Sequence, residues 1–430
     1  MNNSNVEKIK TRVLPCLMMG LFLMFSGSCQ KNESITSNTI DRLNWSEKNF
    51  NVLNQLIKDY GIGGKYYNKN KAPYIVLDWD QTCAHFDVEE AMMRYQLFHL
   101  RYKITKDQFK VLLKDEINGV TQLPETYLNV RLADINHDLI NDYDYLYNNF
   151  SGLNGTMSLE EIQMTPQYED FIAKIPFLYN GYCACPGIGE DYGYPWILYL
   201  FSGYTTDEVK AMAKETISFE LGNQLSKQTL QSPAGLQTNA GIVSYSYKSG
   251  LRVFSEMQNL ISTFKANGID VFIVSASYKP VVEVFSGIGN YGYNVPPENV
   301  IAMELATDNN GIILPEYKPG WVKTFRQGKV DAINMVIKSS LGKNWDPIFS
   351  AGDSDGDYEM SSGFPDMKLS LIWNRVKGGD IGTLCKQAVD EMNSNYPRYI
   401  LQGRNENTGI VIPGSESILF GKTEPQLLYQ

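Results

Sequence analysis

Histidine is scarce in this chain of 430 residues. There are three, His85, His99 and His137, and no two of them stand at the spacing that a zinc site requires. A serine triad, which needs a histidine beside its nucleophile, has equally little to draw on. The expected role of each histidine is structural, so the sequence argues against a zinc enzyme and against a serine hydrolase.

Clusters of basic residues are also missing. The chain has 38 Lys and Arg against 48 Asp and Glu, with a formal net charge of −10. No stretch of positive charge is available to meet a phosphate backbone, which excludes nucleic acid as a partner. The sequence has no internal repeat, and nothing in it indicates a protein partner.

The one strongly apolar stretch at the N-terminus is too short for a transmembrane helix. Three basic residues precede the apolar run 13–25, which ends in Ser26-Gly27-Ser28-Cys29. A membrane-spanning helix needs about 20 apolar residues, so this run predicts a signal peptide. Small residues before a cysteine resemble the cleavage box of bacterial lipoproteins. That resemblance implies a signal peptide over 1–29, lipidation of Cys29 and a membrane anchor. The segment 30–44 begins with a stretch rich in Asn, Ser and Thr, and we expect it to be a tether.

The residue after that cysteine indicates where the protein resides. Gln30 in place of Asp resembles the sorting pattern of lipoproteins in Gram-negative bacteria. The resemblance implies a cell-envelope location at the outer membrane, facing the periplasm or the surface. Export permits disulfides, but the sequence does not choose among the three pairings of the remaining cysteines, which are Cys83, Cys183, Cys185 and Cys385.

Two carboxylates and a hydroxyl follow an apolar run where a buried strand should end. The run 74–77 leads directly into Asp78-Trp79-Asp80-Gln81-Thr82. The carboxyl ends of strands are where α/β sheets place their chemistry. The first carboxylate can attack an electrophile and the second can move a proton, which is the division of labour in covalent phosphoryl transfer.

Three further segments carry matching chemistry. The apolar run 271–274 ends in Ser275-Ala276, which places a second hydroxyl at a strand end. Lys329 falls in the first turn of an expected helix, where backbone donors and an ammonium group suit a phosphate. The run 348–351 leads into Asp353 and Asp357, whose crowded carboxylates call for a hard cation.

These four segments resemble the motifs of the haloacid dehalogenase superfamily of phosphatases. The resemblance implies that Asp78 is the nucleophile, that Asp80 is the general acid and base, and that Ser275 and Lys329 grip the phosphoryl oxygens. It also implies a Mg²⁺ ion held by Asp78, the Asp80 backbone carbonyl and Asp353, with Asp357 as a ligand or an orienting group. Thr82 and Ala276 are further candidates for substrate binding. Because halide-removing members lack a carboxylate at the place of Asp80, the resemblance favours a phosphoric monoester hydrolase.

The spacing of the motifs predicts a large insertion. About 200 residues separate Asp78 from Ser275, far more than one crossover connection needs. We therefore expect an α/β fold, with a Rossmann-like parallel sheet and a mostly helical cap inserted after the first strand. The expected parts are an N-terminal helical segment 45–70, a core 71–85 plus 250–398, a cap 86–249 and a C-terminal extension 399–430.

Aromatic residues in the expected cap suggest a substrate. Tyr194 and Trp196 belong to a segment rich in Tyr, and aromatic rings attract quaternary ammonium groups. Ordinary packing is the alternative role of these rings. The segment resembles phosphorylcholine phosphatase-like and phosphoserine phosphatase-like enzymes. The leading expectation is a small phosphate ester, phosphocholine or phosphoethanolamine. Phosphoserine or another small polar ester is the alternative, and a lipoprotein that only binds ligands is the non-enzyme alternative.

Overall fold

The computed structural model describes residues 38–429. The signal peptide, Cys29 and most of the expected tether lie outside these residues. None of the helices in residues 38–429 is both long enough and apolar enough to cross a membrane. Within the same range, the thiols of Cys83, Cys183, Cys185 and Cys385 are all free.

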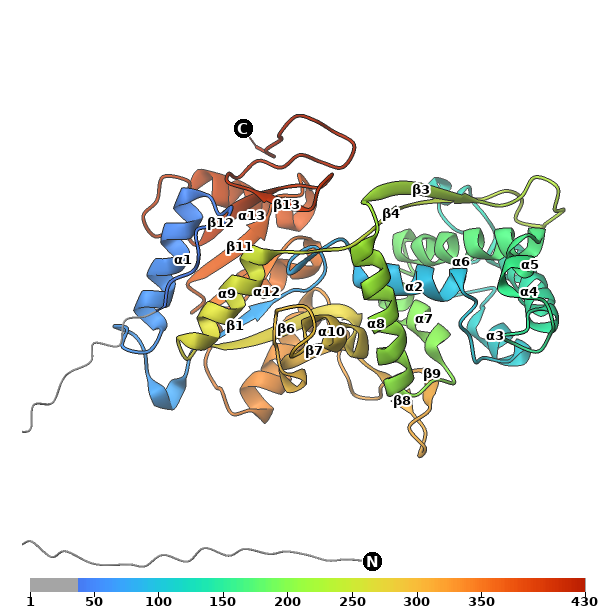
Figure 1. Cartoon of the computed structure of the whole chain (residues 1–430), viewed down its shortest axis with the longest axis horizontal. Helices are drawn as coiled ribbons and strands as arrows, with labels where there is room; N and C mark the ends of the chain where they lie inside the picture. Colours follow the sequence, from blue (N-terminus) through green and yellow to red (C-terminus); the bar gives the residue numbers. More distant parts are fainter. Residues whose placement is uncertain (1–37, 430) are drawn as a thin grey trace, which may run out of the picture. The chain divides into compact units, whose positions relative to one another are not determined.

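A sheet of seven strands organises the described chain, in the order β13-β12-β11-β10-β1-β6-β7. Neighbouring strands are parallel except for β13, which runs antiparallel to β12 (Figure 1). The strand bounds are β1 Tyr74–Leu77, β6 Asp270–Tyr278, β7 Val300–Met303, β10 Phe349–Gly352, β11 Leu369–Trp373, β12 Tyr399–Asn405 and β13 Ile410–Ile412. The α/β fold predicted from the sequence is confirmed.

Both faces of the sheet are covered, which explains why its strands are almost continuously apolar. Along β1 the side chains alternate, so Tyr74 and Val76 pack on one face while Ile75 and Leu77 pack on the other. The first face is covered by α11 (Gln327–Ala332), its continuation Ile333–Ser340 and α12 (Tyr358–Ser362). The second is covered by α1 (Glu47–Tyr60), α9 (Ser255–Ala266) and α10 (Lys279–Ser286).

The mostly helical insertion lies between β1 and β6, as the motif spacing predicted. Its helices are α2 Val88–Phe98, α3 Lys106–Leu112, α4 Leu132–Asn149, α5 Leu159–Gln163, α6 Pro166–Ala184, α7 Glu190–Leu198 and α8 Thr206–Gly222. A two-stranded ribbon, β3 (Ser226–Gln231) with β4 (Ser244–Ser249), follows them. The chain leaves and re-enters the core side by side, because β2 (Ala84–His85) pairs with β5 (Arg252–Val253).

The C-terminal segment belongs to the sheet. Residues 399–430 were expected to form an extension, but they supply β12 and β13. The helix α13 (Gly379–Asp390) connects β11 to β12 and packs against β12 through Leu384. Residues near the C-terminus of the chain, such as Arg404 of β12, therefore lie close to the segment that follows β1.

Candidate active site

The ends of three neighbouring strands bring the sequence motifs together. β1 lies between β10 and β6, and all three run in the same direction. Asp78 follows β1 and remains attached to β10, because its backbone N–H donates to Ala351 O over 3.0 Å. Ser275 lies near the end of β6, and Asp353 follows β10 directly. Parallel pairing therefore gathers these polar residues at one edge of the sheet.

A buried cluster of three carboxylates and one ammonium group forms at this edge. Asp78, Asp353 and Asp357 each present a carboxylate oxygen within 4.8 Å of the other two. Lys329 Nζ lies 2.6 Å from Asp78 Oδ1 and 2.6 Å from Asp357 Oδ1. Asp357 also accepts from the Asp353 N–H at 2.9 Å and the Ser354 N–H at 3.2 Å. It therefore fixes both the ammonium group and the loop after β10.

The three carboxylates of the cluster outnumber the cations bonded to them, which are Lys329 and Arg375. Burial, with the charge of Asp357, raises the pKa of Asp78 to about 8, although Lys329 opposes this shift. Burial acts against the charge of Lys329 as well, but Asp357 and Asp78 outweigh it and raise the pKa of that lysine. Burial would also raise the pKa of Asp353, yet Arg375 and then Lys377 hold it below its usual value. Three converging oxygen donors with one shared ammonium fit a hard divalent cation.

Asp80 lies beside this cluster but faces a different set of partners. Its Oδ1 accepts from the Val88 N–H at 2.7 Å, and its Oδ2 accepts from the Ser277 hydroxyl at 2.5 Å. Burial, with a contribution from Asp87, raises the pKa of Asp80 well above its usual value. A carboxyl group held in this way can carry a proton at neutral pH and pass it to an oxygen in the cavity.

A cavity of about 700 Å³ opens over these groups. Its floor contains Asp78, Asp80, Ser275, Ala276 and Lys329. Most of the remaining lining comes from the helical insertion and from the loops after β10 and β11. The insertion contributes two lysines, Lys227 and Lys248, and a group of carboxylates and aromatic rings, which are Asp87, Glu90, Tyr179, Glu190, Tyr194 and Tyr245. A molecule bound here could touch the carboxylate cluster and this acidic, aromatic group at the same time.

Two residues predicted to bind substrate do not line the cavity. Trp196 is 1% exposed and packs against Tyr182, and its indole N–H donates to Leu112 O over 2.9 Å. Thr82 is fully buried and its hydroxyl has no hydrogen-bond partner. Tyr194 does line the cavity, with its hydroxyl donating to Glu190 Oε1 over 3.3 Å. The predicted contact of Trp196 with substrate is therefore wrong, because this ring packs inside the insertion. The predicted contact of Thr82 with substrate is also wrong, because this side chain is buried.

Several residues of the cavity were not singled out from the sequence. Ser277 is not among the predicted site residues, yet its hydroxyl donates to Asp80. Arg375 pairs with Asp353 and lines the cavity. A signal for Arg375 was present, because Asn374-Arg375 follows the apolar run 369–373, in the manner of the other motifs. Glu90 gave no such signal, since it lies on a helix face that the sequence alone does not orient.

Comparison with known proteins finds a similar phosphatase. No protein-family model matches the chain. The phosphorylcholine phosphatase of Pseudomonas aeruginosa is 25% identical over 334 residues, which cover 72% of this chain and 76% of that protein. The four motifs that resemble those of the haloacid dehalogenase superfamily thus occur in a chain that is similar to a phosphatase. The set of Asp78, Asp80, Ser275 and Lys329 in one cavity favours an enzyme over a lipoprotein that only binds ligands.

A solved structure supports the fold of this chain along nearly its whole length. A conserved protein of unknown function from Anaerococcus prevotii is 32% identical, with a TM-score of 0.80. The match covers 90% of this chain and 99% of that protein. The insertion and the C-terminal strands are therefore part of an arrangement that this chain shares with a bacterial protein.

Proposed function

We propose that this protein is a phosphatase of the haloacid dehalogenase superfamily, which hydrolyses small phosphate monoesters through a covalent phosphate on Asp78. Phosphocholine or phosphoethanolamine is the leading substrate. One observation supports this above the others. A single cavity joins the buried carboxylate cluster to a second pole lined by Asp87, Glu90 and Tyr194. A phosphate ester with a cationic head group has the matching distribution of charge.

Each residue of the floor has a part in the proposed reaction. The Asp78 carboxylate attacks phosphorus, a new bond forms between its oxygen and phosphorus, and the bond from phosphorus to the ester oxygen breaks. Asp80 gives a proton to the departing alcohol oxygen. In the second half of the reaction Asp80 takes a proton from a water molecule that attacks phosphorus, which releases phosphate and restores Asp78. Lys329 and Ser275 bind the phosphoryl oxygens.

The carboxylate cluster fits a magnesium ion. Asp78, Asp353 and Asp357, with the Asp80 backbone carbonyl, would hold Mg²⁺, which when bound offsets the negative charge of the phosphate and of Asp78. Lys329 supplies part of the same compensation from the protein itself. Its contacts with Asp78 and Asp357 keep the ammonium group where the phosphoryl oxygens would lie.

Arg94 compensates the carboxylates of the second pole only in part, because it pairs with Glu90 at 3.4 Å and leaves the pKa of Asp87 raised. Burial, with the charge of Glu90, raises the pKa of Asp87 to about 7, which is the behaviour of an incompletely compensated carboxylate. An ammonium head group would provide the missing charge. The rings of Tyr179, Tyr194 and Tyr245 line the same region, and a ring that faces such a group adds about 0.5 to 2 kcal/mol.

Phosphoserine or another small polar ester is the second candidate. Lys248 and Lys377 line the same cavity and would suit a carboxylate on the substrate. The two candidates place the second charge of the substrate on different walls. We also propose that residues 86–249 act as a cap, whose closure would exclude water from the phosphorylated Asp78.

A panel of phosphate esters tests the proposed function. Purified protein is assayed with Mg²⁺ on phosphocholine, phosphoethanolamine, phosphoserine and a neutral aryl phosphate, and kcat/KM is compared. We expect the cationic esters to be preferred and Asp78→Asn to abolish turnover of every ester. Preference for phosphoserine would replace the leading substrate by the second candidate. Near-normal turnover by Asp78→Asn would refute the covalent mechanism.

We further propose that the protein is exported and anchored through Cys29, on the basis of its sequence pattern. Cys29→Ser should leave the precursor uncleaved or move the protein out of the detergent phase. Cys385→Ser, at a free buried thiol, is the matched control and should leave partitioning unchanged. Recovery of the wild type as an unlipidated protein in the aqueous phase would contradict this location.

A further inference from the structure

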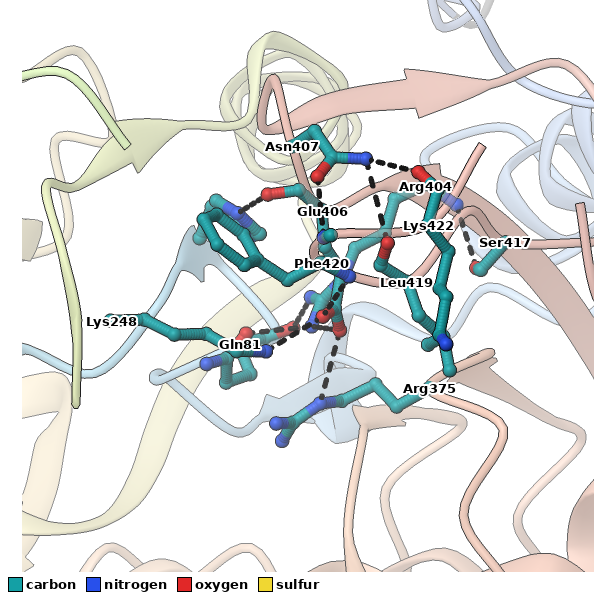
Figure 2. Close-up of polar contacts among 12 residues, drawn as sticks. Gln81, Lys248, Arg375, Arg404, Glu406, Asn407, Ser417, Leu419, Phe420 and Lys422 are labelled. Atoms are coloured by element: carbon teal, nitrogen blue, oxygen red, sulfur yellow. Dashed lines mark hydrogen bonds and ion pairs between the residues drawn. The ribbon is translucent and has the colours of Figure 1, made fainter. Parts of the chain in front are cut away.

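A cluster of buried charges lies at the end of β12, beside the candidate active site. Figure 2 shows Glu406 facing the side chains of Lys248, Arg375 and Arg404. Arg404 is fully buried and Glu406 is 3% exposed. Neither of these two residues lines the cavity, whereas Lys248 and Arg375 do. Arg404 and Glu406 therefore contact the site only indirectly, through side chains such as Lys248 and Arg375 that line the cavity.

Arg404 holds the residue that follows Asp80. Its Nη1 donates to the Gln81 carbonyl oxygen over 2.5 Å, and its Nη2 donates to Gln81 Oε1 over 2.6 Å. Gln81 has φ of +64°, in the left-handed region that residues other than glycine adopt at an energetic cost. One guanidinium thus binds both the backbone and the side chain of a strained residue, next to a carboxyl group of the site.

Glu406 compensates the positive charges that this arrangement brings together. Its Oε2 accepts from Lys248 Nζ at 2.9 Å, and its Oε1 lies 3.5 Å from Arg404 Nη2 and 3.8 Å from Arg375 Nε. Burial opposes ionisation, but Arg404 and then Lys248 lower the pKa of Glu406 to about 2. Burial and the nearby Arg375 lower the pKa of Arg404 to about 10. Without the Glu406 carboxylate the two guanidinium groups would repel each other.

The turn that carries Asp80 has few other restraints at Gln81. The next three N–H groups, of Thr82, Cys83 and Ala84, all point to the carbonyl oxygen of Trp79. The Gln81 N–H itself makes a long bond of 3.3 Å to Phe86 O. The contacts from Arg404 are the shortest that Gln81 makes, so they are the contacts best placed to hold its φ.

We propose that Arg404 and Glu406 are positioning residues, which hold the turn 80–84 so that the Asp80 carboxyl group stays aligned with Ser277. This inference rests on the proposed function insofar as Asp80 moves the proton. It adds to that function a requirement for Arg404, in the last parallel strand, and for Glu406, just after that strand, both outside the four motifs.

Substitution of Arg404 tests the inference. Arg404→Met removes both contacts to Gln81, and we expect kcat to fall on the order of 10-fold to 100-fold with KM changed by less than about 3-fold. Arg398→Met is the matched control, because Arg398 immediately precedes β12 and also donates to backbone carbonyls, those of Ser361 and Phe364. Arg404→Lys keeps the charge beside Glu406 without the forked contact, and gives the same test if the Met variant does not fold.

Substitution of Gln81 by glycine tests whether Arg404 acts by holding the backbone of Gln81 or only stabilises the fold. Glycine adopts a φ of +64° without strain, so Gln81→Gly should lower kcat slightly in the wild type but raise it several-fold in Arg404→Met. Glu406→Gln should lower kcat in the same direction as Arg404→Met. If glycine lowers kcat equally in both backgrounds, Arg404 does not act through Gln81 and the inference is wrong.

Hydrogen exchange gives a readout that needs no substrate. Amides of segment 78–86 should exchange faster in Arg404→Met than in Arg398→Met, and Gln81→Gly should partly reverse the change. Faster exchange in a protein that hydrolyses no phosphate ester would uphold the positioning of the turn and refute the proposed function. Unchanged exchange together with unchanged kcat would overturn the inference while leaving the phosphatase activity intact.

Discussion

The Ser277 hydroxyl donates to Asp80 Oδ2 over 2.5 Å. The two residues come from neighbouring strand ends, because β1 and β6 pair in parallel through Leu77 and Ile273. This bond orients the carboxyl group to which we assign proton transfer, and it leaves Asp80 outside the group of carboxylates that converge on Asp353.

Removal of that hydroxyl should slow the chemical step. We expect Ser277→Ala to lower kcat by about 10-fold with little change in KM, because the carboxyl group is still present but no longer oriented. Ser277→Thr, which keeps a hydroxyl, is the matched variant and should retain most of the activity. Steady-state kinetics on one ester is sufficient. Equal kcat values for Ser277→Ala and the wild type would show that Asp80 needs no such partner.

Metal dependence should depend on Asp353. A chelator should abolish turnover and added Mg²⁺ should restore it, whereas Asp353→Asn should require at least about 10-fold more Mg²⁺ or stay inactive. Asp390→Asn, at an exposed residue paired with Lys386, is the control and should titrate like the wild type. Calorimetric titration of Mg²⁺ into each protein measures the affinity directly. Full turnover in excess chelator would contradict a metal site in this cluster.

Substrate selectivity should depend on the second pole of the cavity. Glu90→Gln and Tyr194→Leu should each lower kcat/KM for phosphocholine by up to about 10-fold, since each removes part of the attraction for an ammonium group. Turnover of a neutral aryl phosphate should change much less. An equal fall for both substrates would mean that these side chains shape the cavity without recognising charge.

Trp196 should affect stability and leave selectivity unchanged. Trp196→Leu removes buried ring contacts and leaves the Leu112 carbonyl without its donor, so we expect the free energy of unfolding to fall by about 3 kcal/mol. Denaturant titration measures this change, and the ratio of kcat/KM for phosphocholine and an aryl phosphate should stay the same. A change in that ratio would show that the indole does reach the substrate.

Stability should fall with rising pH because of Glu89. Burial is the main cause that raises the pKa of Glu89 from 4.5 to about 8 in the folded protein, against a hydrogen bond from the Tyr278 N–H. Between these two pH values the folded chain holds a proton that the unfolded chain has lost, so the free energy of unfolding decreases as pH rises. Glu89→Gln should remove this loss, so its stability relative to the wild type should be higher at pH 8 than at pH 5 by about 3 to 4 kcal/mol. Denaturant titrations at both pH values decide, and parallel pH profiles would contradict the assignment.

The part of the site that follows strand ends could be predicted from the sequence. Asp78, Ser275 and Asp353 each follow or end an apolar run, and parallel strands necessarily bring such ends together. Helix faces were harder. Tyr194 and Trp196 are two positions apart on α7, which separates their directions by about 200°, so both cannot face one cavity. A stretch of aromatic residues therefore does not reveal which rings reach a ligand.

The C-terminal strands escaped prediction for a different reason. β12 contains Gln402, Gly403 and Arg404, which break an apolar run. Gln402 pairs with β11, whereas Gly403 and Arg404 pair with β13. The positive φ of Gln81 has no sequence signature either, since Gln is not a residue that favours the left-handed region. Contacts made between segments distant in the chain, such as Arg404 with Gln81, are set by the fold and have no local pattern.

The position of β1 in the sheet also sets the order in which the enzyme can mature. β1 ends at Leu77, but its two neighbours end only at Tyr278 and Gly352, and Arg404 comes later still. At about 5 to 20 residues per second, roughly 15 s to 1 min of synthesis separates Asp78 from the strands that bury it. A chain whose synthesis stops before β12 would contain all four motifs but would lack Arg404, and therefore the two hydrogen bonds that Arg404 donates to Gln81. Activity should therefore arise only when almost the whole chain has been made.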